Sequence, residues 1–129
     1  MRKLERELAR RRLDFEMRSY RQAGKAKNPT NDLLRAVRQA LHIPVAEIAG
    51  RMGVNRSAVF ELEAREVKNT ISLRSMSRMA QAMGCKVVYG IVPEGGKKLE
   101  DIVEERLWKA LLIGGVAAVR RILPVRRDG

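Results

Sequence analysis

Six residues between positions 55 and 65 carry side chains that can contact the bases or the phosphates of DNA. They are Asn55, Arg56, Ser57, Phe60, Glu61 and Arg65. Arginine can donate two hydrogen bonds to guanine O6 and N7, glutamate can accept one from cytosine N4, and phenylalanine can pack on a thymine methyl. Asn55 can cap a helix whose positive end favours phosphate. Two alternatives stay open: Glu61 can instead hold Arg56 in place or face water, and Phe60 can belong to the core.

The residue types of the chain give little support for catalysis or metal binding. His42 and Cys85 are the single histidine and the single cysteine, whereas a zinc site needs about four ligands. The serines have no plausible histidine partner for nucleophilic catalysis, and no phosphate-binding glycine loop occurs. We therefore expect no catalytic residue, no metal and no cofactor, so the chain is not an enzyme. His42 is expected at the surface and Cys85 in the core.

Two helices joined by a tight turn, from Val45 to about Glu63, would position the base-contacting residues. The spacing combines an apolar first residue, a small fifth residue, a glycine at the ninth position and two later apolar residues. These positions are Val45, Ala49, Gly53, Val59 and Leu62. The small residue lets the helices approach, and the turn can require a positive φ that only glycine adopts at low cost. Glu63 is interpreted as a structural salt-bridge residue.

The chain divides along its sequence into three parts. Residues 1–30 form a basic helical arm and a linker, residues 31–84 carry four short helical signals, and residues 85–129 begin with a strand and end in a long helix. Asn31 or Asp32, Asn55 and Ser72 are the expected helix caps. Gly114 and Gly115 are expected to kink the last helix.

In the arm, apolar residues form two groups on different sides of the expected helix from Arg2 to Arg21. Leu4, Leu8 and Phe15 share one side, and the other group is Ala9, Leu13, Met17 and Tyr20. A helix wedged between two surfaces would show this pattern. The strand expected over Lys86 to Val92 has no second strand in the chain, so a partner copy would satisfy its backbone groups.

The charge balance favours polyanionic partners. The formal net charge is +12, of which residues 1–27 contribute +6, and such an excess attracts nucleic acid, an acidic membrane surface or an acidic protein. A solvated surface that keeps the protein soluble is the alternative.

The most apolar run, Leu107 to Val119, is shorter than the about 20 residues of a membrane span. With no apolar stretch behind the basic N-terminus and a single cysteine, we expect a cytoplasmic protein that does not insert into membranes.

These residues resemble the Cro/cI-like, XRE-type helix-turn-helix family over Leu33 to Gly84. The pattern includes Arg38, Leu41, Glu47-Ile48-Ala49, Met52-Gly53-Val54, Val59, Leu62-Glu63 and Ser72-Leu73. The resemblance implies a mainly all-α fold, with a lambda-repressor-like helix-turn-helix core, a short β-strand after its fourth helix, and helical N- and C-terminal extensions. Pro44-Val45 departs from the Thr or Ser that commonly starts the first helix of the motif and often contacts a phosphate.

A closer likeness is to the small XRE proteins called mobile mystery protein A. It is carried by Leu13-Asp14, the segment GCKVVYGIVPEGG and Leu99-Glu100-Asp101-Ile102. Those proteins occur on mobile elements, often beside a Fic-domain gene, and the strand is also similar to that of HipB-type antitoxins, where two copies pair across a dimer. The resemblance implies a homodimeric transcription regulator that binds double-stranded DNA and controls its own operon.

These features are consistent with three functions. The first is a dimeric, sequence-specific transcription regulator, the autorepressor of a mobile-element or toxin-antitoxin-like operon. The second is an antitoxin-like module that neutralises a partner toxin, held by the arm or the last helix, with a Fic-domain neighbour as one candidate. The third, a basic membrane-surface protein, would use the last helix. Apolar faces without an assigned contact on both terminal helices favour a protein partner for that part of the chain.

Overall fold

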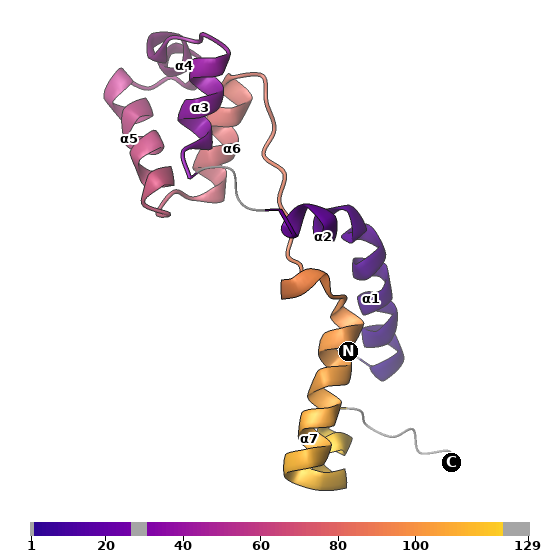
Figure 1. The fold of residues 1–129 in the computed structure, drawn as a ribbon. Helices are drawn as coiled ribbons and strands as arrows, with labels where there is room; N and C mark the ends of the chain where they lie inside the picture. Colours follow the sequence, from indigo (N-terminus) through magenta and orange to yellow (C-terminus); the bar gives the residue numbers. More distant parts are fainter. Residues whose placement is uncertain (1, 27–30, 123–129) are drawn as a thin grey trace. The chain divides into compact units, whose positions relative to one another are not determined.

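The computed structural model describes residues 2–26 and 31–122, and of residue 122 only the backbone. The described residues form helices and no β-strand (Figure 1). The elements are α1 (Lys3–Glu16), α2 (Arg18–Gly24), α3 (Leu33–Ala40), α4 (Val45–Met52), α5 (Arg56–Val67), α6 (Leu73–Ala82), the 3-10 turn η1 (Glu94–Gly96) and α7 (Leu99–Ile122). Contacts group them into a central unit, residues 28–88, and a terminal unit, residues 1–27 with 89–129.

The central unit packs α3, α4, α5 and α6 around one apolar core. Ile48 of α4, Val59 of α5 and Met79 of α6 are its fully buried large side chains. The other buried members of this core are Leu34, Ala49, Ala82 and Met83. Because α4 and α5 each contribute residues from the predicted spacing, including the small Ala49, the two helices of the motif pack closely. The four predicted core helices are confirmed.

Local signals mark the end of α4 and the starts of α5 and α6 where the sequence predicts them. Gly53 adopts φ 69° after α4, the left-handed conformation that costs a residue with a Cβ about 1–2 kcal/mol. The side chains of Asn55 and Ser72 accept hydrogen bonds from the backbone N–H groups of Ala58 and Ser75. These two caps and the positive φ of Gly53 are confirmed.

The start of α3 is held by a residue far along the chain. The backbone N–H of Leu34 donates to the Glu66 carboxylate at 2.8 Å, and Glu66 is buried. A buried carboxylate is stable only when its oxygens receive hydrogen bonds. Glu66 thus ties α3 to the end of α5, a contact that no local pattern predicts.

The segment after α6 corrects two expectations. Residues 86–92 form no strand, because a strand exists only through pairing and the described chain offers it no partner strand. Cys85 is exposed rather than buried, because Gly84, at φ 75°, turns the chain away from the core directly after Met83. His42 is exposed, as expected, and adopts φ 54°.

In the terminal unit, α1 and α7 lie side by side (Figure 1). Buried Asp14 of α1 accepts hydrogen bonds from the backbone N–H groups of Leu99, at 2.8 Å, and Glu100, at 3.4 Å. Arg10 also pairs with the Glu100 carboxylate at 2.7 Å. Asp14 is therefore the N-terminal cap of α7, supplied from another helix, and it fixes the arm to the C-terminal segment.

Both long terminal helices are interrupted. The helix expected from Arg2 to Arg21 breaks at Met17, where φ is −93° and ψ is 7°, so α1 and α2 are separate. The predicted kink in α7 is confirmed at Gly115, whose φ of 68° and ψ of −158° are not helical. Within the described ranges, no helix is long and apolar enough to cross a membrane.

Candidate nucleic-acid interface

α5 has one buried side and one exposed side. Val59, Glu63 and Glu66 are buried, and all six residues predicted to contact DNA are exposed. Asn55, Arg56 and Ser57 lie at the start of the helix, Phe60 and Glu61 one turn later, and Arg65 another turn on. The structure therefore places the six on the start and exposed side of one helix, as a helix-turn-helix requires of the helix that enters the major groove.

Arg56 is the cation best placed to reach a base. It is the first residue of α5, is exposed, and its side chain forms no ion pair or hydrogen bond with another described residue. The neighbouring Asn55 uses its Oδ1 atom to accept the Ala58 N–H at 2.8 Å. Because that cap fixes the start of the helix while leaving Arg56 without a partner, the guanidinium can turn toward a ligand without breaking an interaction.

Glu61 and Arg65 form an ion pair one turn apart on the exposed side. The Arg65 Nη2 atom lies 2.5 Å from Glu61 Oε1, with about half of each side chain exposed. The alternative in which Glu61 holds Arg56 is therefore not what the structure shows, since Arg65 takes that role. Exposed pairs of this spacing contribute about 0.3–0.5 kcal/mol, so either partner can exchange the other for a base or a phosphate at small cost.

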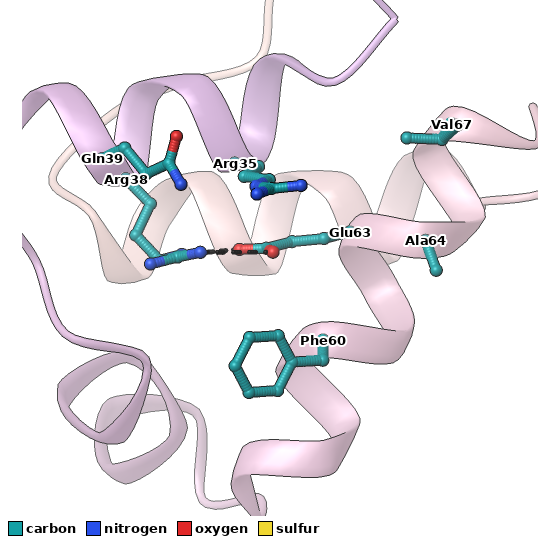
Figure 2. Close-up of a pocket in the computed structure, with 7 residues that line it drawn as sticks. All are labelled: Arg35, Arg38, Gln39, Phe60, Glu63, Ala64 and Val67. Carbon is teal, nitrogen blue, oxygen red and sulfur yellow. Dashed lines mark hydrogen bonds and ion pairs between the residues drawn. The ribbon is translucent and has the colours of Figure 1, made fainter.

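Phe60 lies beside a groove between α3 and α5. Phe60 is 54% exposed, so it is not a core residue. The groove has a volume of about 430 Å³, and its other lining residues are Arg35, Arg38, Gln39, Glu63, Ala64 and Val67 (Figure 2). Because Phe60 lies on the exposed side of α5, its side chain is available for an apolar contact.

One buried ion pair fixes α5 to α3. Glu63 accepts hydrogen bonds from Arg38 Nε at 2.5 Å and from Arg38 Nη2 at 3.3 Å (Figure 2). Only 12% of the Arg38 side chain and 8% of the Glu63 side chain are exposed. The structural interpretation of Glu63 is confirmed. Its partner, Arg38, lies 25 residues earlier, and no local sequence pattern joins the two.

α4 carries fewer groups that could contact a phosphate. Pro44 precedes it with φ −64° and offers no side-chain hydroxyl at the helix start. Arg51 pairs with Glu47 at 2.7 Å and donates to the Ala82 carbonyl at 2.6 Å, which ties α4 to the end of α6. Arg51 therefore has a structural role, which its position in the sequence does not reveal.

Two arginines of the basic arm pair with carboxylates of the same helix. Arg11 pairs with Glu7 at 3.0 Å, and Arg12 pairs with Glu16 at 2.8 Å. The hydrogen bond with Glu16, aided by its charge, raises the pKa of Arg12 above its ordinary value. The net charge of +6 over residues 1–27 already includes these carboxylates, and α1 contributes +1 of it.

Residues 34–89 match the family model described as helix-turn-helix, which is of the XRE type. The match begins inside α3 and includes all of α4, α5 and α6. That family is one of DNA-binding regulatory domains and not of enzymes. In the comparisons with curated proteins and with solved structures, nothing matches the chain.

Proposed function

We propose that the protein is a homodimeric, sequence-specific transcription regulator that places α5 in the major groove of double-stranded DNA. The observation that carries the proposal is the exposed side of α5 within the matched helix-turn-helix, with Arg56 free of other described partners. In this proposal Asn55, Arg56, Ser57, Phe60, Glu61 and Arg65 contact the DNA. Arg56 donates to guanine O6 and N7, and Glu61 accepts from cytosine N4.

The phosphate contacts come from the ends of α5. The N-terminal N–H groups and the positive end of the helix dipole favour a phosphate beside Asn55 and Ser57. Arg65 reaches a phosphate when it releases Glu61, because their pair is exposed and weak. Such contacts set the register of the helix, whereas contacts to base edges set the sequence preference.

A dimer supplies the rest of the recognition. One such helix reads only a few base pairs, and two copies about one DNA turn apart, roughly 34 Å, read a symmetric operator. The likeness to mobile mystery protein A and to HipB-type antitoxins supports a cytoplasmic autorepressor of a mobile-element or toxin-antitoxin-like operon.

A second candidate is an antitoxin-like module that neutralises a partner toxin, such as the product of a neighbouring Fic-domain gene. It is favoured by the large apolar side chains that the terminal unit exposes, among them Leu112 and Ile113. Both functions can coexist in one chain, with DNA at the central unit and protein at the terminal unit.

The test is binding of the full chain to its own upstream DNA and to random DNA, at about 150 mM salt where charge-driven binding is weakened. Arg56→Ala should lose about 1–3 kcal/mol on the specific site and relax the preference at one base pair. Lys68→Ala, which removes an exposed cation after the other end of α5, should leave that preference unchanged. Equal losses on both DNAs for Arg56→Ala would contradict a base-reading role.

A further inference from the structure

A helix inserted in the major groove brings the helices beside it close to the DNA backbone. The major groove of B-DNA is about 12 Å wide, and an α-helix with its side chains is about 10–12 Å across. A helix in that position therefore lies between two phosphate-lined strands. α3, α4 and α6 pack against α5, so a free cation on one of them that borders the exposed side of α5 is placed to meet a phosphate.

One groove borders the exposed side of α5. Phe60 lines it together with Ala64, which lies one turn further along the helix, and Arg35, Arg38 and Gln39 line it from α3 (Figure 2). All of these residues except Arg38 are exposed. The volume of about 430 Å³ leaves room for a group the size of a phosphate.

Arg35 is the free cation of this groove. Its side chain forms no hydrogen bond or ion pair with another described residue. Arg38 and Glu63, the other charged residues that line the groove, are paired with each other. Two arginines and one glutamate give the lining a formal charge of +1, and the exposed Gln39 amide adds N–H donors. The groove therefore suits an anion that accepts hydrogen bonds.

A second polar groove of the central unit includes no residue of α5. It lies between α4 and α6 and is lined by Arg51, Met52, Arg78, Gln81 and Ala82. Both arginines already donate to backbone carbonyls, Arg51 to Ala82 at 2.6 Å and Arg78 to Met52 at 3.4 Å. These contacts tie α4 to α6, whereas the Arg35 guanidinium can turn toward a ligand without breaking a described interaction.

On the basis of the proposed function, we propose that Arg35 binds a backbone phosphate of the DNA in the groove between α3 and α5, with the Gln39 amide as a second donor. The planar guanidinium can give two parallel hydrogen bonds to one phosphate. The buried pair of Arg38 and Glu63 holds α3 on α5 and so positions Arg35 relative to Phe60. DNA is the favoured source of the phosphate, because the groove continues into Phe60, which is proposed to pack on a base.

Such a contact positions α5 on the duplex without reading its sequence. Phosphates carry no sequence information, so a contact to one of them fixes the register of the protein. It also releases counterions and adds about 0.9 to the slope of log K against log salt concentration. Between about 50 and 200 mM salt, a slope of this size lowers the affinity by about 3.5-fold for one contact.

The first test measures the salt slope of the full chain on a duplex of random sequence. Arg35→Ala should lower the slope by about 0.9 and weaken binding to random and preferred DNA by the same factor. Arg35→Lys keeps the charge and should keep the slope. The matched control, Lys109→Ala, removes an exposed cation of α7 without a described partner and should leave the slope unchanged. Urea unfolding should show the same stability for all four proteins.

The second test locates the contact on the DNA. Phosphates of the preferred site are replaced one at a time by neutral methylphosphonates, and binding of the wild type is compared with that of Arg35→Ala. At one position in each half-site, the replacement should weaken the wild type at least about threefold and leave Arg35→Ala unaffected. Equal losses for both proteins at every position would overturn the proposal. Inorganic phosphate, added at constant ionic strength, should not release the wild type from DNA; release that Arg35→Ala escapes would assign the groove to a free anion.

Failure of this contact and failure of the proposed function give different results. A sequence preference that depends on Arg56, together with an unchanged salt slope in Arg35→Ala, would overturn the phosphate contact and leave the function standing. A changed sequence preference in Arg35→Ala would also overturn it, because the arginine would then read a base. A slope lowered in Arg35→Ala, with no preferred sequence for any form, would overturn the function and still support the groove as a contact to the DNA backbone.

Discussion

The buried pair of Arg38 and Glu63 offers a sharp test of how the DNA-facing helix is held. The Glu63 carboxylate receives two hydrogen bonds from the Arg38 guanidinium, with N–O distances of 2.5 and 3.3 Å. Replacing Glu63 with alanine removes both bonds and leaves a nearly buried positive charge on α3. The variant should therefore destabilise the central unit through an uncompensated charge.

The magnitude follows from the burial of the two side chains. Removing one partner of a buried ion pair costs about 3–5 kcal/mol, a large part of the about 5–15 kcal/mol by which a domain is stable. Because 12% of the Arg38 side chain is exposed, the guanidinium can partly turn toward water, so we expect the lower end of this range. Replacing both partners, as in Arg38→Met with Glu63→Leu, should recover most of the loss, because no buried charge then remains.

Urea unfolding of the full chain, followed by circular dichroism, gives the free energies of unfolding for this comparison. The control is Glu47→Ala, which breaks the exposed pair with Arg51 and should cost under about 1 kcal/mol. A loss in Glu63→Ala no larger than in Glu47→Ala would refute the reasoning. So would a double variant that is as unstable as the single one.

Three further predictions test other contacts. Gly53→Ala should destabilise the central unit by about 1–2 kcal/mol in urea unfolding, because φ at this position is 69°; an unchanged stability would show that the turn can relax. Asp14→Ala should lower the thermal stability of the terminal unit by about 0.5–2 kcal/mol through loss of the α7 cap, measured by circular dichroism, and a more stable variant would contradict the capping role. Glu61→Gln should shift the preferred base at its contact from cytosine to adenine, because glutamine pairs with adenine N6 and N7; a preference still for cytosine would remove Glu61 from base reading.

Features of the fold that depend on neighbouring residues could be predicted from the sequence. The start of α5 after Asn55, the start of α6 after Ser72 and the turn at Gly53 follow from local capping and backbone preferences. The apolar spacing of α4 and α5 located Ala49 and Val59 in the core because a helix repeats its faces every few residues.

Features that join distant parts of the chain could not be predicted. Asp14 caps α7 from 85 residues away, and Glu66 holds the start of α3 from 32 residues away. In the sequence, nothing distinguishes Asp14 or Glu66 from the other charged residues of their helices. The strand over residues 86–92 was expected from composition, but a strand needs a partner strand, and composition does not supply one. The prediction that Cys85 is buried is wrong, because its burial depends on the direction in which Gly84 turns the chain.

In the candidate site, too, the exposure of the residues could be predicted and their pairing could not. That Asn55, Arg56, Ser57, Phe60, Glu61 and Arg65 would be exposed together followed from helical spacing and from the buried positions between them. Which carboxylate would pair with which arginine did not follow, since Glu61 had two cations within reach along the helix. The structure pairs it with Arg65 and leaves Arg56 free of any described partner.

Selection of bound sequences from a pool of random duplex DNA tests the central claim most directly. The full chain should enrich a two-fold symmetric site, with half-sites about one DNA turn apart, and bind it at least about a thousandfold more tightly than random DNA. The Arg56→Ala variant, selected in parallel, should lose the preference for a guanine at one position in each half-site. A pool that shows no enriched sequence, or an identical enriched sequence for the wild type and Arg56→Ala, would contradict recognition through α5.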